Sequence, residues 1–162
     1  MEKIKQYLNA GGSSSPLPET LMRAFNDLYS RQCLTSAGLA VGTTTTKFKL
    51  GNATYAVVGG LTVLVASADG PVLTGYNLTS GQVGGFVVTV DSTGTIYAQA
   101  IGAAATIGSI VYPVIQPTQA VVGVVLINTT NAATFTGGTT VMNASNVTYV
   151  NVIGPFYPNN VF

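Results

Sequence analysis

The sequence predicts a mainly β protein: an antiparallel β-sandwich or jelly roll, preceded by an N-terminal arm and one α-helix. From Gly38 onward, short runs rich in Val, Thr and aromatic residues alternate with Gly and Asn turns, which is typical of antiparallel strands. Before that point, one segment has apolar residues at helical spacing. A chain of 162 residues suits one main domain with a buried core. We therefore expect an arm, linker and helix in residues 1–37 and the sandwich domain in residues 38–162.

The N-terminal arm is short and charged. It carries Lys3 and Lys5 and has no apolar stretch, so a signal peptide is not expected. Residues 10–15, Ala-Gly-Gly-Ser-Ser-Ser, have the composition of a flexible linker. The arm is therefore expected to be joined to the rest of the chain by a short flexible connection.

The predicted helix spans Pro16 to Leu34. Ser15 suits the N-cap position, and prolines are tolerated in the first helical turn. Arg23 and Asp27 can pair on the wet face. We expect the apolar side to pack on the β domain, on a second copy of the chain or in a different protein. That apolar stripe consists of Leu17, Leu21, Phe25 and Leu28, widened by Met22 and Tyr29.

Cys33 is the only cysteine of the chain and falls within the predicted helix. A single cysteine excludes an intrachain disulfide. With no His in the chain, the usual base for a catalytic thiol is missing. We expect Cys33 to be a small buried side chain on the helix.

Strands and turns are predicted along the rest of the chain. Gly59-Gly60 has the composition of a two-residue hairpin turn, and Asp69-Gly-Pro and Asp91-Ser-Thr-Gly favour further turns. In one expected strand, Phe86, Val88 and Val90 share a face. The run from Val121 to Ile127 is apolar throughout, which is typical of a strand buried on both faces. The expected strands are Thr44–Leu50, Tyr55–Val58, Leu61–Ala66, Phe86–Asp91, Thr95–Ala100, Val121–Ile127, Thr139–Met142 and Val147–Ile153.

Charged residues are few and lie mostly near the N-terminus. Nine of the eleven charged side chains fall within the first 49 residues, and only Asp69 and Asp91 follow Lys49. Enzyme and metal chemistry need ionisable groups, and nucleic-acid binding needs clustered cations. The uncharged run from Ile96 to Ile115 contains Gln, Gly and Pro, which disfavours a transmembrane helix. We therefore expect no catalytic residue, cofactor, metal, nucleic acid or membrane.

The uncharged strands also raise the question of their edges. Charged side chains normally protect exposed strand edges from pairing with other chains. Here such residues are missing, so we expect the edges to be covered by other copies of the chain, in a ring or a trimer.

Three smaller groups of residues have two interpretations each. Asp69 and Asp91 are expected to serve their turns, with a glycosidase-like carboxylate pair as the alternative. Lys47 and Lys49 alternate on an expected strand and share a face, which is either solvated or in contact with an acidic partner. Tyr149, Phe156 and Tyr157 are expected to close the core or fill a subunit contact, with sugar stacking as the alternative.

The order of the strand and turn phrases resembles that of small β-rich virion proteins of tailed bacteriophages, of the head decoration or cement type. The likeness covers roughly residues 38–155 and is one of layout and turn phrases; none of them is a diagnostic motif. The phrases are Val41-Gly-Thr-Thr-Thr-Thr-Lys-Phe-Lys49, Tyr55-Ala-Val-Val-Gly-Gly-Leu61, Phe86-Val-Val-Thr-Val-Asp-Ser-Thr-Gly-Thr95, Val121-Val-Gly-Val-Val-Leu-Ile127, Phe135-Thr-Gly-Gly-Thr-Thr140 and Val147-Thr-Tyr-Val-Asn-Val152.

The resemblance implies a structural function on the capsid surface of the virion. Such proteins often sit as trimers at local threefold axes, clamp neighbouring subunits of the major capsid protein and stabilise the shell. The family has no catalytic residues to carry over. The alternative is a carbohydrate- or receptor-binding module of a phage fibre or tail, which needs exposed aromatics; the chain has eight Tyr and no Trp. From the placement of charge, the residues expected to dock on the capsid or form subunit contacts are Lys3, Lys5, Arg23, Phe25, Tyr29, Arg31, Lys47 and Lys49.

Overall fold

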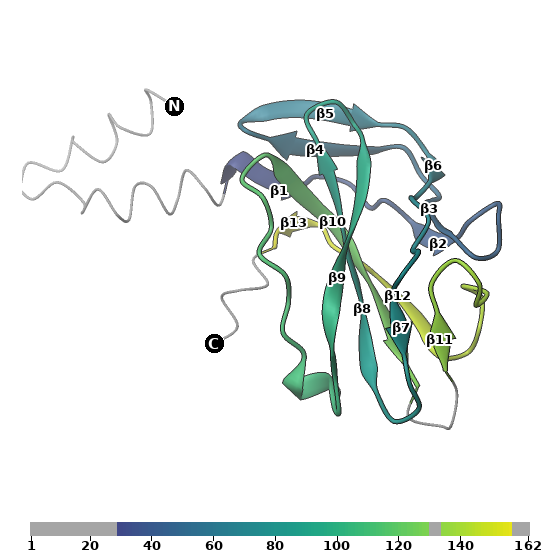
Figure 1. Cartoon of the computed structure of the whole chain (residues 1–162). Helices are drawn as coiled ribbons and strands as arrows, with labels where there is room; N and C mark the ends of the chain where they lie inside the picture. The colour runs from purple at the N-terminus through teal and green to yellow at the C-terminus, as the bar shows by residue number, and fades with distance from the viewer. Residues whose placement is uncertain (1–28, 130–133, 157–162) are drawn as a thin grey trace, which may run out of the picture.

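The fold is mainly β in the computed structural model, which describes residues 29–129 and 134–156 (Figure 1). Within these residues the strands form four antiparallel sheets, two of four strands, one of three and one of two. One 3₁₀ turn of the same ranges, η1, covers Ile107–Ser109. The strands are β1 (Arg31–Cys33), β2 (Leu39–Val41), β3 (Phe48–Leu50), β4 (Thr54–Val58), β5 (Leu61–Val65), β6 (Ala68–Asp69), β7 (Asn77–Leu78), β8 (Val83–Asp91), β9 (Ile96–Ala104), β10 (Gln119–Asn128), β11 (Phe135–Thr136), β12 (Val147–Asn151) and β13 (Gly154–Pro155).

The first four-stranded sheet has the order β13-β1-β4-β5. Its β4–β5 hairpin confirms the predicted turn, since Gly59 and Gly60 both have positive φ, 60° and 82°, which glycine adopts without strain. The predicted C-terminal end of the helix is wrong. Tyr29 and Ser30 are helical, but Arg31–Cys33 pair with β4 on one side and β13 on the other. Backbone pairing with two strands outweighs the helical spacing of the side chains. Residues 16–28 of the predicted helix lie outside the described residues.

Cys33 is fully buried, as expected, but on a strand and not on a helix. Its thiol donates a hydrogen bond to the carbonyl oxygen of Thr35 at 2.9 Å and lies 3.4 Å from the hydroxyl of Thr54. Cys33 therefore acts as a packed core residue at the edge of a threonine cluster.

The second four-stranded sheet has the order β12-β10-β8-β9. Its two central strands are buried on both faces, which confirms the prediction for the run that begins at Val121. Along β8, Phe86, Val88 and Val90 face the main core, and Val87 packs in a separate cluster on the opposite face. The alternation predicted for this strand is confirmed.

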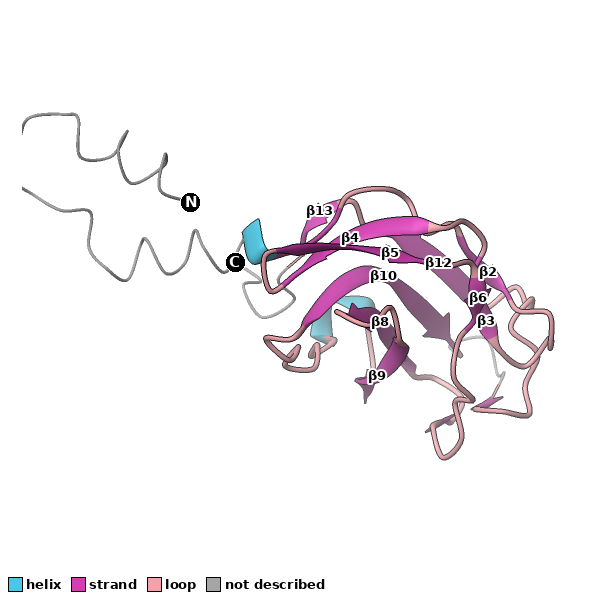
Figure 2. Ribbon diagram, turned by 90° about the horizontal axis from the view of Figure 1, so that it is seen from above, coloured by secondary structure: helices cyan, strands magenta, loops and turns pink. Residues whose placement is uncertain are grey.

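The first sheet lies over the second, with the main core between them (Figure 2). Ala56, Val58 and Val65 of the first sheet meet Val90 and Val122 of the second in this core. The small sheets β2-β3-β6 and β11-β7 lie at one side of the two large sheets (Figure 1) and add the fully buried side chains Phe48, Leu50, Leu78 and Phe135.

The outer face of the second sheet is covered by the segment of residues 105–118, which runs down the left side of Figure 1. A second apolar cluster forms there, because side chains of this segment pack on the sheet. Val87, Ile101, Val121 and Val124 of the sheet contact Ile110, Tyr112 and Ile115 of the segment, together with Leu126, Val152 and Phe156. This cover explains why β8 and β10 are apolar on both faces.

Two strand predictions need correction. Thr139–Met142 form a turn, because the amides of Thr139 and Thr140 both donate to the carbonyl of Thr136, at 3.1 and 2.8 Å. Of the predicted strand Thr44–Leu50, only Phe48–Leu50 is a strand, since the preceding loop is closed by a hydrogen bond from the Lys47 amide to the Thr44 carbonyl. In the described ranges, no helix has the length and hydropathy needed to cross a membrane.

Candidate functional site

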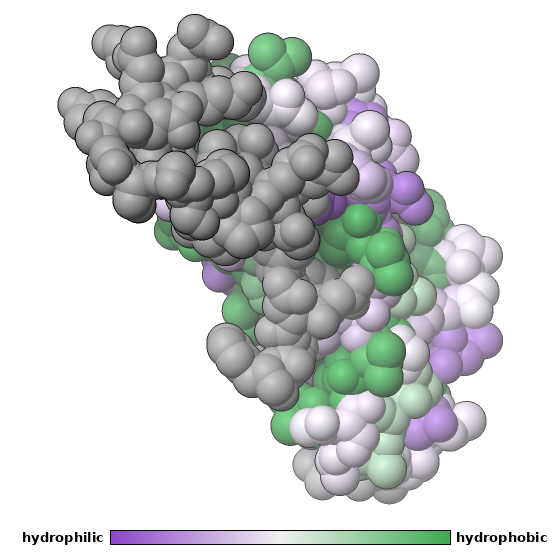
Figure 3. Space-filling view, turned by 90° about the vertical axis from the view of Figure 1, so that its left-hand side faces the viewer, coloured by the Kyte–Doolittle hydropathy of each residue, from purple (hydrophilic) through white to green (hydrophobic). Residues whose placement is uncertain are grey.

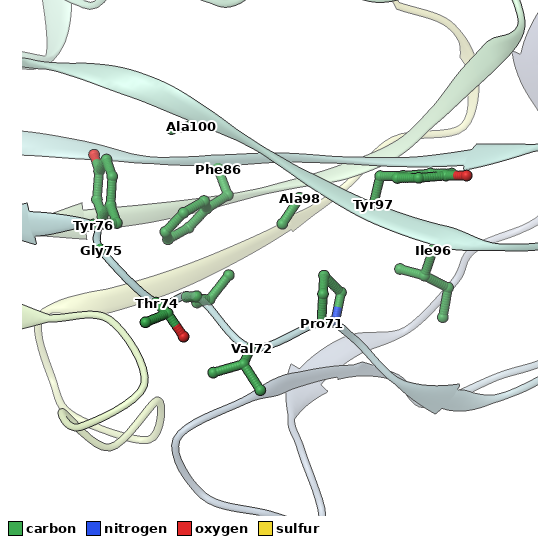
Figure 4. A pocket seen from close by; sticks show the side chains of 11 residues that line it. Pro71, Val72, Thr74, Gly75, Tyr76, Phe86, Ile96, Tyr97, Ala98 and Ala100 are labelled. Atoms are coloured by element: carbon green, nitrogen blue, oxygen red, sulfur yellow. The ribbon is translucent and has the colours of Figure 1, made fainter.

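A groove lies beside β9, the edge strand of the second sheet, where the loop of residues 71–76 passes its inner face (Figure 4). Its volume is about 530 Å³, which falls in the range of small-molecule sites in proteins. The lining carries no charged side chain. It is made by Pro71, Val72, Leu73, Thr74, Gly75 and Tyr76 of the loop, by Phe86 of β8, and by Ile96, Tyr97, Ala98 and Ala100 of β9.

Tyr76 ties the groove loop to the sheet. Its hydroxyl donates to the carbonyl of Ile101 at 2.8 Å and accepts from the amide of Gly85 at 2.7 Å. Its ring lies 4.4 Å from the ring of Phe86, centroid to centroid, and 6.3 Å from that of Phe135. Burial raises the pKa of Tyr76, so the hydroxyl stays protonated and keeps both hydrogen bonds.

Only glycine fits at position 85, whose amide donates to the Tyr76 hydroxyl. Gly85 has φ of 143°, and a Cβ there would lie 1.9 Å from the carbonyl oxygen of Val125 on the neighbouring strand. The glycine lets β8 and β10 approach while its amide turns toward the tyrosine. The groove therefore depends on a backbone irregularity in β8.

Tyr97 and Asp91 form a polar pair next to the groove. The Tyr97 hydroxyl donates to Oδ2 of Asp91 at 2.8 Å, and Oδ1 accepts from the amide and hydroxyl of Thr93, at 2.8 and 2.6 Å, and from the amide of Thr95, at 3.1 Å. These bonds, that of the Thr93 hydroxyl first, lower the pKa of Asp91 to about 2. The Asp91 carboxylate in turn raises the pKa of Tyr97. Asp91 is an ionised acceptor that organises its own turn, as expected.

Asp69 serves a different loop. Its carboxylate accepts from the amide of Thr43 at 2.9 Å and from that of Thr44 at 3.4 Å, across 26 and 25 residues of sequence. The Thr43 bond is the main cause of the lowered pKa of Asp69, and the charge of Lys47 adds to it. Asp69 and Asp91 each bind the backbone of a separate loop.

The predicted contact residues do not form one cluster within the described residues. Arg31, at the start of β1, donates to the carbonyl of Gln116 at 3.4 Å, and the neighbouring Tyr29 is 59% exposed. Lys49 lies on β3, at the opposite side of the molecule in Figure 1. Lys47 precedes this strand, which corrects the expectation that both lysines alternate along it. Lys3, Lys5, Arg23 and Phe25 lie outside the described residues.

The aromatic residues near the C-terminus pack against the sheets. The Tyr149 hydroxyl donates to the carbonyl of Met142 at 2.9 Å, and burial raises the pKa of Tyr149 to about 12. Phe156 makes an edge-to-face contact with Tyr112, with ring centroids 6.0 Å apart. Both residues close apolar clusters, as expected. Tyr157 lies outside the described residues.

Large apolar side chains are exposed over much of the uncharged part of the molecule. Figure 3 shows such side chains on the face that carries the segment of residues 105–118. No Asp, Glu, Lys or Arg occurs after Asp91 in the sequence, so these exposed apolar side chains come from a stretch without charged residues. The exposed residues after Asp91 are Tyr97, Ile107, Val111, Val114, Val141, Val150 and Ile153.

In residues 29–129 and 134–156, no three His, Cys, Asp or Glu side chains gather in a group that could hold a metal ion. Comparison of the chain with protein-family models, with curated proteins and with solved structures finds no match.

Proposed function

We propose that this chain is a structural virion protein that binds the outside of a bacteriophage capsid as a homo-oligomer. In this role it clamps neighbouring subunits of the major capsid protein and stabilises the shell, and a homotrimer is the assembly we expect. The single observation that carries the proposal is the uncharged, apolar surface built from the residues after Asp91. Large exposed apolar areas are typical of surfaces that contact other proteins.

An antiparallel β-sandwich is the fold class we propose for the body. The two four-stranded sheets face each other across a common apolar core, which supports this class. In such a body the end strands of each sheet present unpaired backbone groups. Strand β9 pairs only with β8 among the described strands, and the exposed side chains of Tyr97 and Ala100 lie along it. An uncharged edge of this kind favours contact with another chain.

The proposal is tested by adding purified full-length chain to capsids that lack it. We expect saturable co-sedimentation and a higher rupture temperature of the shell. The variant Ala100→Glu puts a charge at the β9 edge, and we expect weaker self-association or capsid binding, because a partner chain on this edge would bury the unpaired charge. Ala53→Glu, in an exposed loop between β3 and β4, strands of other sheets than that of β9, is the matched control. A monomeric chain without affinity for capsids would refute the proposal.

A second function, a carbohydrate- or receptor-binding module of a phage fibre or tail, is favoured by one observation. The groove offers the exposed ring of Tyr97 and the partly exposed ring of Tyr76, and aromatic rings stack on sugar faces. A glycan array tests it. Saturable binding that is lost in Tyr97→Ala would support this function, and an array without binding would remove it.

A further inference from the structure

One end of the outer face of the second sheet carries polar side chains. Val87 of β8 packs in the second apolar cluster on this face, so Thr89 and Asp91, at alternate positions further along the strand, point to the same side. Residues opposite each other in register share a face. Tyr97 lies opposite Thr89, Gln99 opposite Val87 and Gln119 opposite Asp91. We call the polar members of this group the polar patch: Thr89, Asp91, Tyr97, Gln99 and Gln119.

Two glutamines from different strands meet in the polar patch above Thr89, whose side chain is fully buried. The side-chain oxygen of Gln119 accepts from the Thr89 hydroxyl at 3.0 Å and from the side-chain nitrogen of Gln99 at 2.5 Å. The same nitrogen lies 3.5 Å from the Thr89 hydroxyl oxygen. The inner atoms of both amides are therefore fixed by bonds that link β9, β8 and β10.

The outer atoms of the two amides have hydrogen-bonding capacity that the protein does not use. Among the residues that the structure describes, neither the side-chain oxygen of Gln99 nor the side-chain nitrogen of Gln119 has a hydrogen-bond partner. Both side chains are partly exposed. The patch therefore offers solvent one acceptor and one donor side by side, on amides that are already held in place.

An aromatic ring lies beside this donor and acceptor. Tyr97 is 38% exposed, and its hydroxyl donates to Asp91 at 2.8 Å, which fixes the ring. Tyr97 and Gln99 are alternate residues of β9, so their side chains leave the strand about 6.5 Å apart on one face. In Figure 4 the Tyr97 ring extends along β9, while the side chains of Ile96 and Ala98 point into the groove.

We propose that the polar patch binds a neutral sugar, with one face of the sugar ring on Tyr97 and two neighbouring hydroxyl groups on Gln99 and Gln119. One hydroxyl donates to the Gln99 oxygen, and the other accepts from the Gln119 nitrogen. An apolar ring with a few fixed polar groups is typical of small-molecule sites. Asp91 is the one charged side chain of the patch, and its negative charge disfavours an anionic ligand.

This inference goes beyond capsid binding and does not rely on it. Of the exposed apolar side chains that support the capsid proposal, the polar patch uses Tyr97 alone, and those of residues 105–118 and Ile153 stay available to a protein partner. The sugar class is shared with the second function proposed above, but the site lies outside the groove.

NMR titration of the purified full-length chain with the methyl glycosides of glucose, galactose and mannose tests the site. We expect saturable binding of at least one of them. Gln119→Glu keeps an oxygen for Thr89 and Gln99 but loses the outer donor, so we expect binding to weaken on the order of tenfold. Gln99→Met, which removes the outer acceptor at similar size, is expected to weaken binding to the same degree. Thr74→Val, an isosteric change in the groove loop, is the matched control and should bind as the original chain does.

Three results would overturn the inference. The first is that none of the three neutral glycosides binds saturably. The second is that both glutamine variants bind as the original chain does. The third is that Thr74→Val loses the sugar while the glutamine variants keep it, which would place the sugar in the groove. Melting temperatures show that each variant is folded, and Gln99→Met decides if Gln119→Glu does not fold.

The charge of the ligand is tested with lactose and sialyllactose, which differ by one anionic sugar. We expect lactose to bind at least as tightly, and tighter binding of sialyllactose would contradict a site for neutral sugars. Co-sedimentation with capsids is a separate readout. If capsid binding fails while the glutamine variants lose the sugar, the inference stands without the proposed function; if capsid binding holds and no glycoside binds, the inference alone fails.

Discussion

Replacing Tyr76 with Phe removes one hydroxyl that holds two backbone groups. The ring contacts with Phe86 and Phe135 remain, so the change isolates the hydrogen bonds. The amide of Gly85 loses its 2.7 Å acceptor, and the carbonyl of Ile101 loses its 2.8 Å donor. Gly85 and Ile101 are both buried, and a buried backbone group left without a partner costs about 1–3 kcal/mol. Because Tyr76 itself is partly exposed and water can reach some of the site, we expect a loss of about 2–4 kcal/mol in the free energy of unfolding.

Urea unfolding, followed by circular dichroism, measures this loss. Tyr149→Phe is the matched control, because Tyr149 is also a partly buried tyrosine but its hydroxyl makes one hydrogen bond, to the carbonyl of Met142. The control is expected to lose about 1 kcal/mol. If Tyr76→Phe were as stable as the control or as the original chain, the Tyr76 bridge would not hold the groove loop, and the account of the groove would be wrong.

The remaining predictions concern a glycine and an aspartate. Gly85→Ala is expected to prevent folding or to lower the melting temperature strongly, because its Cβ would meet the Val125 carbonyl at 1.9 Å, whereas Gly102→Ala, with no atom within 4 Å of the new Cβ, should leave the melting temperature nearly unchanged. Asp91 has a pKa lowered from 3.8 to about 2, so its contribution to stability is present above pH 3.8 and is lost as the pH falls toward 2. Between pH 3.8 and about pH 2, the free energy of unfolding should therefore fall less steeply with decreasing pH for Asp91→Asn than for the original chain. An identical slope would contradict the role of Asp91 in its turn.

The long central strands could be predicted from sequence because their apolar residues follow patterns that are typical of strands. In β8 the alternation of Phe86, Val88 and Val90 survives folding, and in β10 a continuous apolar run corresponds to burial on both faces. Strands of two or three residues have no period to detect. β1, for example, exists because Gln32 pairs with Val57 on one side and with Pro155 on the other, and both partners are distant in sequence.

The candidate groove was not predictable from local pattern. The loop of residues 71–76 has turn residues but no motif, and its position depends on the Tyr76 hydroxyl reaching Ile101, 25 residues away. The signal that could have indicated this loop is the pair Gly84-Gly85 inside an otherwise apolar strand, since glycine within a strand often marks a close approach of other groups. Likewise, the sequence could place Asp69 in a turn. Its hydrogen bond with the amide of Thr43, 26 residues earlier, depends on the fold and could not be predicted.

The lack of charged side chains after Asp91 could be predicted, because it follows from the sequence and needs no knowledge of the fold. What composition leaves open is which surfaces are covered and by which chain. The exposed Tyr97 and Val114 lie on different elements, β9 and the 105–118 segment, so more than one contact has to be considered. The two exposed surfaces therefore need separate experiments.

The central claim is that this β protein, whose chain has no charged side chain after Asp91, covers its apolar surface with other copies of itself. Sedimentation equilibrium of the purified full-length chain tests it most directly. We expect a single species at three times the 16.6 kDa chain mass, stable on dilution to micromolar concentration. A species that stays at the mass of one chain at every concentration would contradict the claim.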